Sequence, residues 1–353
     1  MVRQEPPPCT RAGEEVKTAA IFGALILGAA SAVATHAFAQ QNQNFDAVQL
    51  DIQRVSGNVY MMVGAGGNTT VFTGPEGVMI VDTQFAPMSG KIIDAVKKLT
   101  DLPIRWIVNT HMHGDHIGGN ETIARAGRTR AGGNVVGDIG AAATDTARII
   151  AHENALNRLV KADPPLPTAA LPTDVFFNAR KDMLFNGDAV QMFHQPAAHT
   201  DGDLLVHFRR ADVLATGDLF TTVMYPFIDE ANGGTIDGYI KALNNIIAIT
   251  VPSNVNEGGT MVIPGHGRLS DEQDVIEYRD MVTIVRDRIK EYVQRGMTLE
   301  QVKAKKPTLD FDPRYETPDS FWNASMFIDV IYKQMRAANP PQGKPAPPKK
   351  GAK

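Results

Sequence analysis

The sequence of 353 residues is poor in cysteine and has no excess of positive charge. A single cysteine, Cys9, excludes an internal disulfide framework and a cysteine-rich zinc module. Lysine and arginine number 35 against 39 acidic residues, so a nucleic-acid backbone is not an expected partner. Hydrophobic residues make up 43% and charged residues 21%, which excludes a disordered chain, a collagen and a multi-span membrane protein.

One long apolar run lies near the N-terminus, at residues 18–34 (TAAIFGALILGAASAVA). Ala37 and Ala39 follow it in an A-x-A pattern, which is typical of a signal-peptide cleavage site. The run is shorter than the roughly 20 residues of a membrane span. We therefore predict a signal peptide over 1–39, a periplasmic or secreted bacterial protein, and no stable membrane insertion after cleavage.

The C-terminal residues 337–353 (AANPPQGKPAPPKKGAK) combine prolines with lysines and contain no acidic residue. Proline removes backbone donors and like charges repel one another, so this segment is predicted to be a disordered tail. Between the two ends we expect a main domain at 45–270. A helical extension at 271–336 is expected to pack on it, because its apolar residues recur at helical spacing.

Short β-rich runs alternate with helical periodicity through the main domain. Strands are predicted at 59–63, 69–73, 78–82, 104–108, 189–193, 204–208, 213–216 and 261–263. Helices are predicted at 89–99, 119–126, 144–159 and 236–249. Because both halves repeat this order, we expect an α/β fold of two sheets packed face to face, with helices on both outer surfaces.

Four ligand-type side chains follow the strand at 104–108 within six residues, in the sequence His111-Met112-His113-Gly114-Asp115-His116. On a turn that leaves a strand such side chains can converge, so this spacing predicts a metal site. Asp115 and His116 are neighbours and cannot both join His111 and His113 on one ion. The motif therefore predicts two ions a few ångströms apart, as in dinuclear hydrolases.

Each of the two ions needs further ligands from elsewhere in the chain. His199 in AAHTDGDL, Asp218 in LATGDLF and His266 in IPGHG each stand where a predicted strand becomes a loop. We expect all three at the same edge as the first motif. Imidazole and carboxylate ligands suit zinc, with iron or manganese as alternatives.

The motifs HMHGDH, AAHTDGD, TGDLF and PGHG, in this order, resemble those of the metallo-β-lactamase-fold hydrolases over about residues 50–270. The resemblance implies a four-layer αβ/βα sandwich, with 45–270 as the catalytic domain and two zinc ions at one edge. The implied ligand set has three members for one ion, three for the other and one that bridges both: His111, His113 and His199; Asp115, His116 and His266; and Asp218.

The bridging position decides which reaction the resemblance favours. An aspartate there, Asp218, resembles glyoxalase II, lactonases and related ester or thioester hydrolases, whereas β-lactamases of the family mostly have a cysteine or no ligand. We therefore predict a zinc-dependent hydrolase that cleaves an ester, thioester, lactone or lactam in a small-molecule substrate. The alternatives are a β-lactamase, an iron-dependent sulfur dioxygenase and a metal-binding protein without turnover.

Weaker signals point to residues around the ions. Asp115 is expected to orient the attacking hydroxide, and Tyr225 to donate to a substrate oxyanion unless it only packs. Asp82 ends a strand where family members often have an aspartate, so it is expected to hydrogen-bond a ligand unless it caps a turn. Residues 64–68 are either a hairpin turn or a flap over the site, and His152 is placed on the predicted helix.

Overall fold

The computed structural model describes residues 44–129, 146–255, 258–316 and 321–338. The chain divides into two units, Met1–Asn44 and Phe45–Lys353, and both β-sheets belong to the second. The predicted signal peptide at 1–39 lies outside the described residues, as does the predicted tail from residue 339 onward. Within the described ranges, no helix has both the length and the apolar character needed to cross a membrane.

The first β-sheet has seven strands whose spatial order follows the chain. They are β1 (Asp51–Ser56), β2 (Val59–Val63), β3 (Thr69–Gly74), β4 (Gly77–Val81), β5 (Ile104–Val108), β6 (Arg148–His152) and β7 (Asp174–Phe176). Strands β1 to β4 form an antiparallel meander, in which β2 to β4 were predicted, and β4 to β7 are parallel. The carboxyl ends of the parallel strands therefore meet at one edge.

The second sheet has five strands. In spatial order they are β12 (Met261–Ile263), β11 (Val213–Ala215), β10 (Asp203–Phe208), β9 (Asp188–Gln195) and β8 (Arg180–Phe185). The pairs β8–β9, β9–β10 and β10–β11 are antiparallel, and β11–β12 is parallel. Strands β11 and β12 thus also end at a common edge.

Strand β4 shows why the two sheets pack face to face. Every residue of β4 is buried, and successive side chains point to opposite faces. Met79 and Val81 join the core between the sheets, whereas Val78 and Ile80 join a core beneath helices. In the core between the sheets, Phe72 of β3 lies 5.0 Å from Phe208 of β10, measured between ring centroids. A strand with both faces covered belongs to the middle of a layered fold.

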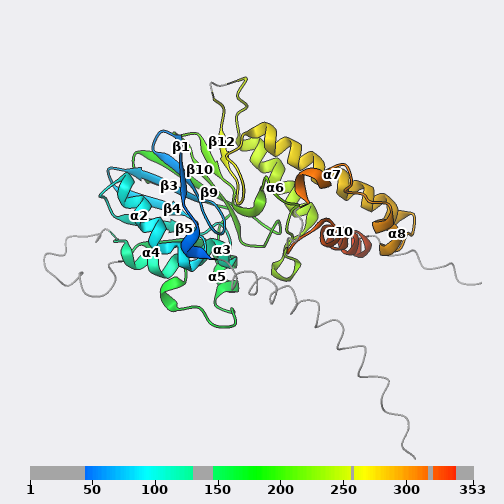
Figure 1. Ribbon diagram of the computed structural model, residues 1–353, viewed down its shortest axis with the longest axis horizontal. Helices are drawn as coiled ribbons and strands as arrows, with labels where there is room; N and C mark the ends of the chain where they lie inside the picture. The colour runs from blue at the N-terminus through cyan, green and yellow to red at the C-terminus, as the bar shows by residue number, and fades with distance from the viewer. Residues whose placement is uncertain (1–43, 130–145, 256–257, 317–320, 339–353) are drawn as a thin grey trace, which may run out of the picture. The chain divides into compact units, whose positions relative to one another are not determined.

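Helices cover the two outer faces (Figure 1). Helices α2 (Ser89–Leu99) and α4 (Asn120–Ala126) pack on the first sheet, and α6 (Ile236–Ile249) and α7 (Glu272–Gln294) pack over the second. Helix α10 (Ala324–Ala338) packs against α7. The other α-helices among the described residues are α3 (Gly114–Ile117), α5 (Glu153–Leu159), α8 (Leu299–Ala304) and α9 (Asp312–Tyr315). The predicted four-layer αβ/βα sandwich and its helical C-terminal part are both confirmed.

The helix predicted at 144–159 is wrong in its first half, because residues 148–152 form β6 and α5 begins at Glu153. The run Ile149–Ala151 is buried between two parallel neighbours, and a short continuous apolar run does not distinguish a buried strand from a helix. Strands β1, β7 and β8 were not predicted. All three lie at sheet edges, where polar residues interrupt the apolar pattern.

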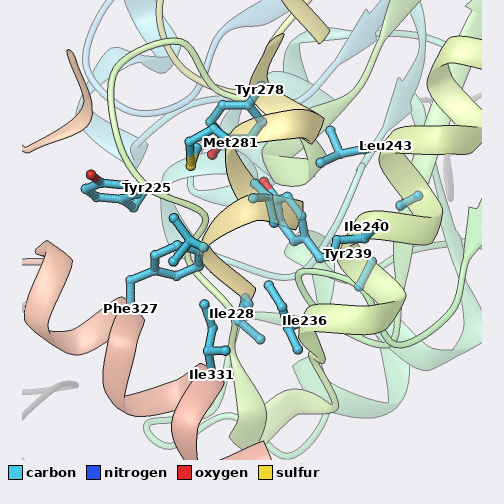
Figure 2. Close-up of a cluster of buried hydrophobic side chains, with 14 of the residues drawn as sticks. Tyr225, Ile228, Ile236, Tyr239, Ile240, Leu243, Tyr278, Met281, Phe327 and Ile331 are labelled. Atoms are coloured by element: carbon cyan, nitrogen blue, oxygen red, sulfur yellow. The ribbon is translucent and has the colours of Figure 1, made fainter. Parts of the chain in front are cut away.

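The hydrophobic core beneath α10 allows a test of whether the C-terminal extension and the main domain are stabilised by one common core. Phe327 is fully buried, and its ring stacks on Tyr225 at 5.2 Å (Figure 2). We expect Phe327→Ala to lower the free energy of unfolding by about 3–5 kcal/mol in urea titrations, because a large aromatic side chain leaves a cavity. The control Phe177→Ala removes a side chain that is 71% exposed and should change it by less than about 0.5 kcal/mol. Equal effects of the two variants would contradict a shared core.

Candidate metal centre

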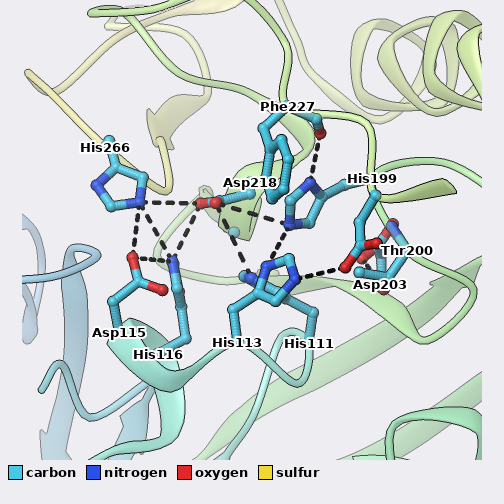
Figure 3. Close-up of polar contacts among 12 residues, drawn as sticks. His111, His113, Asp115, His116, His199, Thr200, Asp203, Asp218, Phe227 and His266 are labelled. Carbon is cyan, nitrogen blue, oxygen red and sulfur yellow. Dashed lines mark hydrogen bonds and ion pairs between the residues drawn. The ribbon is translucent and has the colours of Figure 1, made fainter. Parts of the chain in front are cut away.

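Seven side chains meet at the sheet edge where the parallel strands end (Figure 3). They come from the loop after β5 and from α3, from the loop between β9 and β10, and from the segments after β11 and β12. The seven are the residues predicted from the motifs: His111, His113, Asp115, His116, His199, Asp218 and His266. The two halves of the sandwich thus contribute to a single cluster.

Candidate ligand atoms within 4.8 Å of one another form three overlapping groups, one of which is Asp82, His111 and His116. The other two contain the seven residues of the cluster: His111, His113, His199 and Asp218; and Asp115, His116 and His266. Asp218 stands between them. Its Oδ2 atom lies 3.9 Å from Nε2 of His111 and 3.7 Å from Nε2 of His199. Its Oδ1 atom lies 3.1 Å from Nε2 of His116 and 3.4 Å from Nε2 of His266. The two oxygens of one carboxylate therefore face different groups.

The donor set fits a transition-metal site. Nδ1 of His113 lies 2.9 Å from Nε2 of His199, so two imidazole nitrogens are directed at the same region. Nε2 of His111 is buried without a hydrogen-bond partner among the described residues. A buried polar atom without a partner costs about 1–3 kcal/mol, a cost that an ion bound there would remove. Imidazole with carboxylate is the ligand chemistry of zinc and of neighbouring metals.

Glycines make room for this crowding. A Cβ atom at Gly67 would lie 2.1 Å from Cε1 of His116, and one at Gly265 would lie 2.1 Å from Oδ1 of Asp218. The backbone of the β2–β3 turn is itself held in place, because Gly67 N donates to Asp115 O and Asn68 N donates to Gly265 O. Residues 64–68 therefore form the turn between β2 and β3, and this turn is packed against the cluster.

Hydrogen bonds from outside the cluster orient the imidazoles. Asp82 accepts from Nδ1 of His116 at 2.8 Å and from the backbone N–H of Thr110 at 2.8 Å. Nδ1 of His199 donates to the carbonyl oxygen of Phe227. In each histidine the nitrogen that faces outward is bonded, which turns the other nitrogen inward. Asp82 thus lies against the histidine loop, where the sequence predicted it.

Asp229 makes a contact of the same kind that the sequence analysis missed. Its Oδ2 atom lies 2.9 Å from Nε2 of His113, although 116 residues separate the two in the chain. Asp229 lies in a loop, in the sequence Phe227-Ile228-Asp229-Glu230. No motif surrounds it there, so no local signal could have indicated the contact.

The charges of the cluster are set by burial and by neighbouring groups. Burial, followed by the proximity of His113, lowers the pKa of His199 to about 4. Burial would also lower the pKa of His266, but Asp218 and Asp115 outweigh it and raise this pKa to about 10. Burial opposes ionisation of Asp218, yet His116 and His266 hold its pKa well below the usual range. The buried carboxylate is thus kept ionised by positive charge, which a bound cation also supplies.

Tyr225 is committed elsewhere. Its ring is fully buried, and its hydroxyl donates to Oδ1 of Asp312 at 2.7 Å and contacts the carbonyl oxygen of Thr308. Both partners belong to the C-terminal extension, and no sequence motif there indicates a contact with Tyr225. This corrects the catalytic role expected for Tyr225, and the packing alternative describes it.

A family model described as the Metallo-beta-lactamase superfamily matches residues 62–267. The Linear primary-alkylsulfatase of Pseudomonas sp. (strain ATCC 19151) is 24% identical over 269 residues, covering 65% of this chain and 48% of that protein. The Metallo-beta-lactamase type 2 of Bacillus cereus is 21% identical over 242 residues, covering 66% of this chain and 82% of that protein. The matched segment contains every residue of the cluster.

Solved structures share the fold at low sequence identity. A stereoselective inverting sec-alkylsulfatase from Pseudomonas sp. superimposes with a TM-score of 0.60 at 16% identity, covering 85% of this chain and 52% of that one. A metallo-beta-lactamase from Pontibacter korlensis superimposes with a TM-score of 0.50 at 17% identity, covering 67% of this chain and 99% of that one. The chain thus spans about half the length of the alkylsulfatases it matches.

The close packing of Gly67 against His116 can be tested by adding one methyl group at position 67. Gly67→Ala places a Cβ atom against the buried imidazole of His116, so we expect unfolding to become easier by about 1–3 kcal/mol, as overpacking does. Calorimetric melting would measure this. The matched control is Gly90→Ala in α2, where no described atom lies within 4 Å of the added Cβ apart from its chain neighbours and the backbone of its own helix. It should be neutral or stabilising by up to about 1 kcal/mol. A Gly67→Ala protein as stable as the control would contradict the crowding.

His152 predicts a pH effect on stability that is separate from the cluster. It ends β6, and its ring stacks on His194 at 3.5 Å. Burial and then His194 lower the pKa of His152 from 6.5 to about 4. The unfolded chain therefore takes up this proton at a higher pH than the folded protein. Stability should fall as the pH drops from about 6.5 toward 4.

We expect His152→Phe to reduce this loss, whatever its effect on stability at pH 7.5. We would measure the free energy of unfolding in urea at pH 7.5 and at pH 5.0 for the natural protein and for the variant. The quantity compared is the stability that each protein loses between the two pH values. Equal losses in the two proteins would show that His152 does not contribute.

Proposed function

The chain belongs to the metallo-beta-lactamase superfamily of metal-dependent hydrolases, and on this premise we propose that it is a zinc hydrolase with two ions in one cluster. The observation that carries the proposal is the position of Asp218, whose two oxygens face separate groups of ligand atoms. A catalytic site with one zinc ion needs about three protein ligands. Seven ligand-type side chains in two groups support two ions.

The proposed ligands follow the two groups. His111, His113 and His199 would hold the first ion, and Asp115, His116 and His266 the second. Asp218 would contribute to both. Ions held by these residues would lower the pKa of a bound water toward 7 and would polarise the bond to be broken.

The exposed side of the cluster defines where a substrate approaches. The side chains of His111, His116 and His199 are at most 1% exposed, so they form the buried side of the cluster. Those of His113, Asp115 and His266 are 20–23% exposed. Asp115 is on this open side, and His116 and His266 keep it ionised against the effect of burial. Its carboxylate can therefore accept a hydrogen bond from the attacking water and orient it toward the substrate.

The proposed substrates are small molecules with an ester, thioester or lactone bond, with a lactam as a further possibility. The aspartate at position 218, where the family's β-lactamases mostly have a cysteine or no ligand, supports this preference. A sulfate ester is the second candidate, because an alkylsulfatase is 24% identical over 269 residues. Its cleavage is also a hydrolysis.

We also propose that the protein is exported to the periplasm or the medium. The support is in the sequence, in the uncharged run at 18–34 and the alanines at 37 and 39. In an oxidising compartment the segment that remains after cleavage would need no protection of thiols, because Cys9 lies in the part removed.

The proposal is tested by metal content and turnover measured on the same purified sample. We expect about two zinc ions per chain and hydrolysis of a p-nitrophenyl ester, a thioester or a lactone. Asp218→Ala should reduce the zinc content and lower kcat/KM by at least about 100-fold, because both ions lose a ligand. The control Asp212→Asn changes an aspartate in the turn after β10, at the opposite end of the strand from the cluster, and should leave both unchanged.

The panel also contains nitrocefin and a primary alkyl sulfate, so each alternative has its own readout. Strong nitrocefin turnover would make the protein a β-lactamase despite Asp218, and turnover of the alkyl sulfate alone would favour the second candidate. Iron in place of zinc without hydrolysis would overturn the proposal in favour of an oxidoreductase. Two tightly bound ions without any turnover would favour a metal-binding protein.

A further inference from the structure

His113 is held from both sides. Its Nδ1 atom faces the cluster, 2.9 Å from Nε2 of His199, and its Nε2 atom lies 2.9 Å from Oδ2 of Asp229. A neutral imidazole carries one proton, so one ring nitrogen donates and the other offers a lone pair. A carboxylate cannot donate when ionised, which places the proton on Nε2. Nδ1 is then the nitrogen left to bind an ion.

Asp229 is fixed in place independently of His113. Its carboxylate accepts from the backbone N–H of Asn232 at 3.1 Å and from Nδ2 of Asn232 at 2.6 Å. Its own backbone N–H donates to the carbonyl oxygen of His199 at 3.0 Å. The side chain is 12% exposed. The carboxylate therefore stands in position before His113 binds anything, which lowers the entropy lost when the site is assembled.

The same short segment orients the facing imidazole. The carbonyl oxygen of Phe227 accepts from Nδ1 of His199, and Asp229 lies against Nε2 of His113. Residues 227–232 therefore orient both imidazole rings of this close pair. The segment is supported in turn by the C-terminal part of the chain. Trp322 Nε1 donates to the carbonyl oxygen of Pro226 at 3.0 Å, and its ring lies 4.8 Å from that of Phe227.

We propose that Asp229 is a positioning residue for His113, which accepts the Nε2 proton and so commits Nδ1 to the ion of the first group. This inference rests on the metal-binding function proposed above and adds to it a residue that no motif identifies. Carboxylates that hold a metal-binding histidine in this way typically contribute 10–100-fold to metal affinity. The alternative is that Asp229 only closes the turn at Asn232.

The test compares zinc affinity in the full protein, after metal removal, by competition with a chromophoric chelator. We expect Asp229→Ala to weaken one of the two ions by about 10–100-fold and to leave the other within about threefold. Asp229→Asn keeps an oxygen that can accept from His113, so zinc affinity should fall less in this variant than in Asp229→Ala. Asn232→Ala removes the side-chain Nδ2 donor to Asp229 but keeps the backbone N–H donor of residue 232 and the contact with His113, so it should resemble the natural protein.

Asp212→Asn is the matched control, because Asp212 also lies beside a histidine, His207, at 3.8 Å. It should leave both affinities unchanged. Its backbone has a φ of 54°, a conformation that asparagine adopts readily, so the variant should fold. Long-range ¹H–¹⁵N spectra of histidine-labelled, zinc-loaded protein give a second readout that is independent of turnover. They should show His113 protonated at Nε2 in the natural protein, and in Asp229→Ala this proton should exchange faster with solvent because it has lost its acceptor.

Two results would overturn the inference while the proposed function stands. One is an Asp229→Ala protein that binds both ions as the natural protein does. The other is an Asn232→Ala protein that loses as much affinity as Asp229→Ala, which would show that the turn alone matters. Failure of the proposed function is separate and is read from the natural protein, which would then bind no zinc above the level of a protein blank.

Discussion

The constraint on which the structure depends is the close approach of seven imidazole and carboxylate groups at one buried edge. Such groups repel one another or lose hydration when they are packed together, so each needs a partner behind it. Asp82 stands behind His116, the Phe227 carbonyl behind His199, and Asp229 behind His113. Gly67 and Gly265 provide the space that any side chain would fill. The surrounding protein therefore supports the cluster from several sides.

The sandwich delivers these groups because its strands end together. The loops after β5, β9, β11 and β12 start from rigid, buried strands, so the ligands inherit fixed positions although they stand on loops. The backbone contact between Asn68 and Gly265 joins the turn of one sheet to the loop of the other, directly beside the cluster. The two halves are thus aligned by ordinary backbone hydrogen bonds as well as by the ligands.

The sequence predicts features whose residues lie close together in the chain or form a motif of several ligand-type side chains. His111, His113, Asp115 and His116 stand in six residues, and Asp218 and His266 occur in short glycine-containing motifs after apolar strands, so the cluster could be predicted. The boundary between β6 and α5 could not, because an apolar run of three residues is compatible with strand or helix until its neighbours are known. Tyr225 was misjudged and Asp229 missed for the same reason. Their partners, Asp312 and His113, lie 87 and 116 residues away, and single-sequence patterns contain no record of such distant contacts.

The packing of the C-terminal extension against the segment that orients the histidines has an optical consequence. The chain has two tryptophans, and one of them, Trp322, bonds to Pro226 and lies edge-on to Phe227. Its indole is 5% exposed, so its emission is governed by this protein contact more than by solvent. The other, Trp106, is in β5, which leads directly into the histidine loop. Both tryptophans therefore lie in or beside segments that lead to the cluster, and their fluorescence would report how that edge is arranged.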